Sequence, residues 1–91
     1  MNQDTLIVSN WKMNLNFDSA TQLINKIKKI KFPNSSKIKN IVCPQFLLIP
    51  QISKLVMRSK IILGSQDCHH KISGSFTGDS SLELLKHFHC R

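Results

Sequence analysis

The sequence is poor in acidic residues, in tyrosine and in long apolar runs, and each shortage narrows what the protein can be. It has five Asp and Glu against thirteen Lys and Arg, no Tyr and a single Trp. No apolar run approaches the roughly 20 residues that a membrane-spanning helix needs, which argues against a membrane anchor. The first residues lack a basic segment followed by a long apolar core, so we expect no secretory signal.

Cysteine is scarce as well. The three cysteines, Cys43, Cys68 and Cys90, cannot all pair within the chain. Unpaired thiols in a protein without an export signal are typical of a reducing compartment. We therefore expect free thiols and a cytoplasmic protein.

The sequence does contain enough apolar residues to form the core of one small domain. Hydrophobic residues make up 41% of its 91 residues, which argues against a wholly disordered chain. We expect residues 1–91 to form a single domain.

The net charge of +8 raises the possibility of a nucleic-acid-binding module. A solvated helix face explains most of the charge more simply, because many lysines lie on or just after one expected helix. These are Lys26, Lys28, Lys29, Lys31, Lys37 and Lys39. Only one Arg precedes the last residue, and Arg and stacking aromatics are what most nucleic-acid readers use. A small basic nucleic-acid-binding module is therefore kept as a distant alternative.

Apolar periodicity predicts three strands that alternate with three helices. The strands are expected at 6–9, 38–43 and 61–64, and the helices from 19 to about 30, at 46–57 and at 81–88. The first strand is short and rich in β-branched residues, which indicates a buried parallel strand. Residues 33–36 break the first helix, and 65–80 form a polar loop.

The expected helices carry start signals and apolar stripes. Asp18 can cap the first helix, and the run 80–83 (Ser-Ser-Leu-Glu) fits a capping box that opens the third. Pro50 falls in the early turns of the second helix, where a missing N–H is tolerated. The apolar stripe of the first helix is Ala20, Leu23, Ile24, Ile27 and Ile30, and that of the second is Leu48, Ile49, Ile52, Leu55 and Val56.

Strand–helix alternation is the pattern of an α/β protein, and its crossover connections are almost always right-handed. Three such units make either an open parallel sheet or part of a barrel. Periodicity does not decide between these two architectures.

A polar block, Asn10-Trp11-Lys12-Met13-Asn14, follows the first strand directly. The carboxyl end of a strand is where parallel α/β folds place their sites. A Lys there can bind phosphate or stabilise a developing oxyanion, and a neighbouring Asn can orient the Lys or donate to a substrate. The alternative for a single strand-end Lys is a solvated loop residue.

A second block follows the third strand. It reads Gly-Ser-Gln-Asp-Cys over 64–68 and Gly-Ser-Phe-Thr-Gly-Asp over 74–79. The two blocks together closely resemble two signatures of the triosephosphate isomerase family, whose third loop reads Gly-Ala-Gln-Asn and then Gly-Ala-Phe-Thr-Gly-Glu. The run 42–44 (Val-Cys-Pro) with Phe46, and the run 84–86 in the third helix, add further matches. The resemblance covers essentially the whole chain.

The resemblance implies an α/β fold that is a partial TIM (β/α)₈ barrel, comprising the first three βα units of a fold of about 250 residues. It implies isomerisation of dihydroxyacetone phosphate and glyceraldehyde 3-phosphate, in glycolysis and gluconeogenesis, by a homodimer without a cofactor or metal. It assigns substrate binding to Asn10 and Lys12, with Lys12 also stabilising the enediolate electrostatically. Trp11 and Met13 are expected to be packing residues.

The resemblance also implies a contact between subunits. In the family the residue at Met13 is close to the partner subunit, and the third loop projects into it. Thr77 matches the residue that reaches the partner's active site, with Phe76 beside it. Gly74 and Gly78 permit the tight backbone path.

The catalytic His and the general base Glu of the family have no counterpart in these 91 residues. The expectation is therefore that this chain is inactive alone. It is either a half-enzyme that awaits a separate carboxyl-terminal polypeptide or a non-catalytic remnant of an interrupted gene. An incomplete barrel of this kind is expected to leave its first and third strands with unpaired edges.

Two groups of potential ligand residues could be mistaken for a metal site. They are the adjacent Cys68, His69 and His70, and the later His87, His89 and Cys90. Adjacent ligands do not match the spaced pairs of zinc sites, so we expect no metal here. None of these histidines matches the position of the catalytic His.

Overall fold

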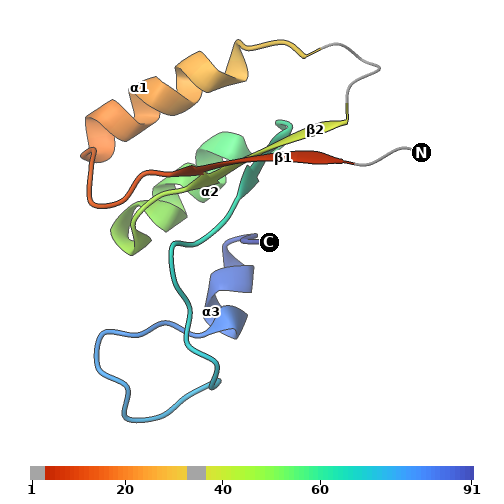
Figure 1. Ribbon diagram of the computed structural model, residues 1–91. Helices are drawn as coiled ribbons and strands as arrows, with labels where there is room; N and C mark the ends of the chain where they lie inside the picture. The colour runs from red at the N-terminus through yellow and green to blue at the C-terminus, as the bar shows by residue number, and fades with distance from the viewer. Residues whose placement is uncertain (1–3, 33–36) are drawn as a thin grey trace.

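The computed structural model describes residues 4–32 and 37–91 of the chain. Three parallel strands form a sheet in the order β1-β2-β3, with helices between and after them (Figure 1). The strands are β1 (Thr5–Asn10), β2 (Ile38–Cys43) and β3 (Ile61–Leu63). The helices are α1 (Phe17–Lys28), the 3₁₀ turn η1 (Phe46–Leu48) that leads into α2 (Ile49–Val56), and α3 (Leu82–His87). The α/β prediction is confirmed, and the arrangement is that of the first βα units of a TIM barrel.

The core lies between one face of the sheet and the helices α1 and α2. Ala20 and Ile24 of α1, Ile52 of α2 and Val42 of β2 are completely buried there. The predicted apolar stripes therefore face inward, because residues three or four apart share one side of a helix. Ile30 is the exception, since α1 ends at Lys28 and the Ile30 side chain is exposed.

The prediction that the first strand is buried is wrong. Leu6 and Val8 of β1 are each 57% exposed. The strand register pairs Val8 with Ile41 and places both on the face opposite Val42 and the helices. No helix in the described part of the chain covers that opposite face. The β-branched pattern of β1 thus suits a buried surface that residues 4–32 and 37–91 do not complete.

The sheet has the two open edges that an incomplete barrel was expected to leave. β2 lies in the middle, and β1 and β3 each pair with a strand on one side only among the described residues. At β3 the Arg91 N–H donates to the Leu63 carbonyl at 2.9 Å, which is a single hydrogen bond and not a strand pairing.

The helix starts differ from the predicted ones. The cap of α1 is Asn16 and not Asp18: the Asn16 Oδ1 accepts the Ser19 N–H at 2.8 Å, and the Ser19 Oγ accepts the Asn16 N–H at 2.9 Å. The cap of α3 is Ser81, whose Oγ accepts the Leu84 N–H at 3.2 Å. Asp18 lies in the first turn of α1, where its negative charge interacts favourably with the positive end of the helix dipole.

The predicted break at 33–36 lies outside the described residues. Among the residues that are described, no helix is both long and apolar enough to cross a bilayer.

Candidate functional site

The carboxyl ends of the three strands meet at one edge of the sheet. β1 ends at Asn10, β2 at Cys43 and β3 at Leu63, and the polar loops that follow them are neighbours. This edge carries the active site in parallel α/β folds, because side chains from several strand ends converge there. Both predicted substrate-binding residues lie on it.

Lys12 has an unusual backbone at this edge. Its φ is 54°, which lies in the left-handed region that lysine seldom occupies. The Asn10 Oδ1 accepts the Lys12 N–H at 2.8 Å, so the two residues lie together at the end of β1. Lys12 is exposed. The ion pairs in the described part of the chain are Lys39–Asp4 and His69–Asp79, and neither engages the Lys12 ammonium group. Its charge is therefore free to meet an anionic ligand.

Trp11 anchors the same loop from below. Its side chain is buried in the core, and its backbone N–H donates to the Cys43 carbonyl at 3.1 Å. The Asn14 N–H and the Asn14 Nδ2 both donate to the Trp11 carbonyl, at 3.2 and 3.1 Å. These contacts make Trp11 a packing residue, as expected, and close the turn that displays Lys12. The expectation that Met13 packs as well is wrong for the described residues, where its side chain is exposed.

Two glutamine side chains fasten this turn to the neighbouring loops. The Gln66 Nε2 donates to the Lys12 carbonyl at 2.8 Å and to the Cys43 carbonyl at 3.0 Å. The Gln45 Nε2 lies 3.3 Å from the carbonyls of both Asn14 and Leu15. Neither glutamine could be assigned to the site from the sequence alone. Gln66 stood within a recognised block, but nothing in the spacing indicated which carbonyls its amide would reach.

A hollow of about 300 Å³ opens beside this turn. It is lined by Met13, Gln45, Phe46, Leu47, Gln66 and Asp67. Two large apolar side chains at its border are strongly exposed, Met13 at 86% and Leu47 at 80%. Apolar side chains gathered around a hollow are typical of an interaction surface.

Thr77 is not part of the cluster around Lys12. The loop that carries it extends away from the sheet (Figure 1), and Thr77 is exposed. It lies in a tight turn, in which the Asp79 N–H donates to the Phe76 carbonyl at 3.1 Å and Gly78 has a φ of 86°. A positive φ at the third residue is what a type II turn requires. A non-glycine residue at Gly78 would be strained.

His69 organises the base of this loop. Its N–H donates to the Ser80 carbonyl at 2.7 Å, and its ring stacks on Phe76 with a centroid distance of 4.0 Å. A Cβ added at Gly74 would collide with the Phe76 ring, so glycine is needed there. Phe76 is thereby folded onto its own loop. His69 thus has a packing role that its position in the sequence, next to His70, did not indicate.

No group of three His, Cys, Asp or Glu side chains in the described part of the chain is arranged to hold a metal ion. The three cysteines are free, as expected, and Cys43 and Cys90 are buried. Burial raises the pKa of the Cys43 thiol. Burial, and then the nearby Cys43, raise the pKa of the Cys90 thiol. A raised pKa keeps both thiols protonated and makes them poor nucleophiles.

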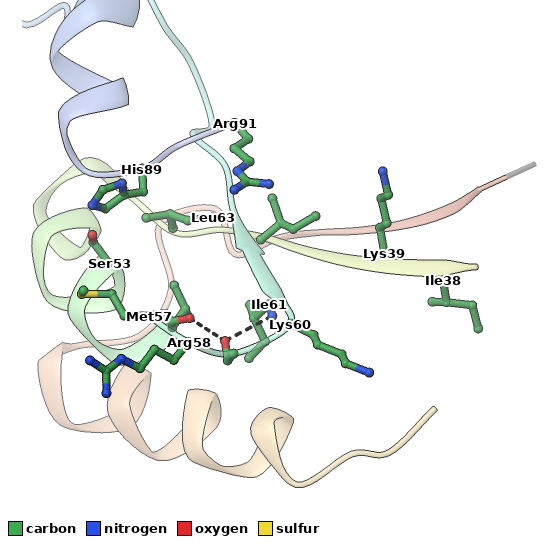
Figure 2. A pocket seen from close by; sticks show the side chains of 13 residues that line it. Ile38, Lys39, Ser53, Met57, Arg58, Lys60, Ile61, Leu63, His89 and Arg91 are labelled. Atoms are coloured by element: carbon green, nitrogen blue, oxygen red, sulfur yellow. Dashed lines mark hydrogen bonds between the residues drawn. The ribbon is translucent and has the colours of Figure 1, made fainter. Parts of the chain in front are cut away.

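Two larger hollows, of about 520 and 620 Å³, lie at the opposite end of the strands. Figure 2 shows the first of them, which is lined by Lys39 of β2, by Lys60 just before β3 and by Arg91. Arg58 and His89 also line this hollow, which has no acidic residue in its lining. These hollows border the incomplete part of the sheet and lie away from Asn10 and Lys12.

Comparison with known proteins agrees with the motifs. The model of a family described as triosephosphate isomerase matches residues 5–91. The chain is 36% identical over 89 residues to a triosephosphate isomerase of Vibrio sp. (strain ANT-300), covering 98% of this chain and 35% of that protein. It is 40% identical over 85 residues to one of Wolbachia pipientis wMel, covering 93% of this chain and 34% of that protein. The chain thus spans about a third of the length of the curated relatives it matches.

Proposed function

The chain belongs to the triosephosphate isomerase family, and from this premise we propose that it supplies the substrate-binding corner of an active site that interconverts dihydroxyacetone phosphate and glyceraldehyde 3-phosphate. The observation that carries the proposal is the turn at Lys12. A lysine held with φ 54° at the carboxyl edge of a parallel sheet presents an unpaired ammonium group where the family places its substrate.

The chemistry explains why a fixed cation is useful there. Interconversion of the two trioses moves a proton between adjacent carbons, and its intermediate is an enediolate with negative charge on oxygen. A preorganised cation stabilises such charge as it develops. In this proposal Lys12 binds the anionic substrate and stabilises the enediolate, but it does not take the proton from carbon. Asn10 keeps the Lys12 turn in place through its side-chain oxygen.

Removal of a proton from carbon also needs a positioned base. The His69 ring stacks on Phe76 and on the His70 ring, and no histidine is among the hydrogen-bond partners of the Lys12 turn in the described residues. We therefore propose that the family's His and Glu come from polypeptide beyond these 91 residues. That polypeptide would be continuous with this chain or would be a separate partner. We also propose a cytoplasmic location, in glycolysis and gluconeogenesis. We propose no cofactor, because the isomerisation is redox-neutral overall and needs no external oxidant or reductant.

The proposal is tested by an isomerase assay on two proteins. One is the 91-residue chain alone, and the other is this chain joined to the remaining two thirds of a relative such as the Wolbachia enzyme. We expect turnover only in the joined protein. A joined protein that folds as a compact barrel but does not turn over would contradict the proposal and leave a non-catalytic remnant as the better description.

We further propose that the working unit is a homodimer in which the loop around Thr77 of one subunit enters the hollow beside Met13 of the other. The support is the exposure of Met13 and Leu47 around that hollow, next to the Lys12 turn. The loop itself is well suited to insertion, because it is closed at its base by His69 and extends from the sheet.

Met13→Glu is expected to convert the joined protein from dimer to monomer at micromolar concentration, because an unpaired carboxylate would be buried in the interface. Analytical ultracentrifugation measures the change. Met57→Glu is the matched control, because Met57 is also exposed but lies at the other end of the strands. Equal dimer fractions in the two variants would place the interface elsewhere.

Nucleic-acid binding remains the second candidate function, and the distribution of charge supports it. The hollow at the amino ends of β2 and β3 is lined by Lys39, Arg58, Lys60, His89 and Arg91, of which Lys39 is paired with Asp4 at 3.0 Å. Binding to DNA or RNA that weakens steeply with salt would favour this candidate. Absence of binding at low salt would remove it.

A further inference from the structure

We propose that Gln66 is a positioning residue for Lys12: its side-chain amide holds the Lys12 backbone in the left-handed conformation and so fixes where the ammonium group lies. The importance of this for a triose phosphate rests on the function proposed above. The conformational part of the inference does not, because it concerns this chain's own hydrogen bonds.

The geometry uses the whole donor capacity of the Gln66 amide. A primary amide has two N–H donors. The Gln66 Nε2 has two acceptors, the Lys12 carbonyl at 2.8 Å and the Cys43 carbonyl at 3.0 Å. Lys12 follows β1, Cys43 ends β2 and Gln66 follows β3. One side chain therefore ties together the loops after all three strands.

The Lys12 peptide is consequently held from both sides. Its N–H is bound by the Asn10 side chain, and its carbonyl is bound by Gln66. The Cys43 carbonyl is shared, because it also accepts the Trp11 N–H at 3.1 Å. A left-handed backbone is unfavourable for lysine and persists only where its surroundings determine it. Of the two bonds, Asn10 is local, whereas Gln66 fixes the turn relative to the rest of the sheet.

A purely structural role for Gln66 predicts something different. If Gln66 only ties loops together, removing its donors would lower stability but leave the Lys12 conformation unchanged. The two roles are separated by a measurement of the Lys12 backbone itself. The NMR cross-peak between the amide and α protons of one residue is strong when φ is positive, because the two protons are then close.

The test compares Gln66→Met with Gln22→Met in the ¹⁵N-labelled 91-residue chain. Methionine is close to glutamine in shape but has no N–H to donate. Gln22 is exposed on α1 and provides the matched control. We expect the Lys12 intraresidue cross-peak to be strong in the wild type and in Gln22→Met, and to weaken in Gln66→Met. A cross-peak that stays strong in Gln66→Met would overturn the inference.

A second measurement covers the case in which Gln66→Met does not fold. In the wild-type chain, the side-chain amide protons of Gln66 are expected to exchange with solvent more slowly than those of Gln22, because both amide protons of Gln66 are hydrogen-bonded. Exchange at the same rate in the two residues would show that the clamp is not formed in solution, and the inference would fail.

Titration with dihydroxyacetone phosphate then separates this inference from the proposed function. We expect the ligand to shift Lys12 resonances in the wild type, with affinity reduced about tenfold in Gln66→Met, since a small misplacement of a binding group is costly. If the cross-peak weakens in Gln66→Met but the wild type itself shows no ligand shift, positioning by Gln66 stands and the proposed function fails. If the cross-peak persists, positioning fails whatever the ligand does.

Discussion

Replacing Lys12 by Met in the joined protein is expected to lower kcat/KM by about 10²–10³-fold, which is the usual effect of removing one group that stabilises an oxyanion. Methionine keeps the length and apolar stem of lysine and removes only its charge. Because Lys12 is exposed and its ammonium engages neither ion pair of the described residues, the substitution should leave stability nearly unchanged. A steady-state isomerase assay, with thermal unfolding alongside, measures both quantities.

The control for Lys12→Met is Lys54→Met, which removes the same charge from the exposed surface of α2. It is expected to leave kcat/KM within a factor of two of the parent. Equal activity in the two variants would mean that the cation at the strand edge is not used. The division of the loss in kcat/KM between kcat and KM is also informative. A fall in kcat indicates stabilisation of the enediolate, whereas a rise in KM alone indicates that Lys12 only binds the substrate.

Most of the fold could be predicted because the apolar periodicities of strand and helix differ so clearly. The exact helix starts could not. Asn16 and Asp18 are both good capping residues, and the choice between them depends on contacts that are distant in sequence. The Gln51 Nε2, from α2, donates to the Phe17 carbonyl at 2.8 Å and so supports a helix that already includes Phe17.

The exposure of β1 shows a different limit. Its residues are apolar on both faces, so a buried position was the reasonable prediction. In the structure Leu6 and Val8 on one face of β1 are each 57% exposed, and Ile7 on the helix-side face is still 44% exposed. The pattern thus describes the environment of a larger assembly, in agreement with relatives about three times as long.

The site was predictable where it is contiguous in sequence and was not where it depends on long-range partners. The run from Asn10 to Asn14 could be recognised as one block. The clamps on that block come from Gln45 and Gln66, which are 31 and 54 residues away from the carbonyls of Asn14 and Lys12. Only the strand order β1-β2-β3 brings these amides to the turn.

The second large effect is expected for the core. Replacing Ile52 by Ala should lower the free energy of unfolding by about 2–5 kcal/mol, which is the usual cost of removing three carbons from a fully buried position. Ile52 has no exposed surface, and it belongs to the same cluster as Ala20, Ile24 and Val42. Small domains have a total stability of about 5–15 kcal/mol. Because β1 leaves Leu6 and Val8 exposed, the 91-residue chain should lie at the low end of that range.

Urea unfolding of Ile52→Ala against Leu84→Ala measures this cost. Leu84 lies on α3 and is 57% exposed, so its truncation should change stability by less than about 1 kcal/mol. A large difference between the two variants would show that α1, α2 and the sheet form a specific core even without the rest of a barrel. Equal, small effects would mean that the isolated chain collapses without fixed packing. The turn at Lys12 would then not be fixed in the isolated chain, and the inference about Gln66 would fail.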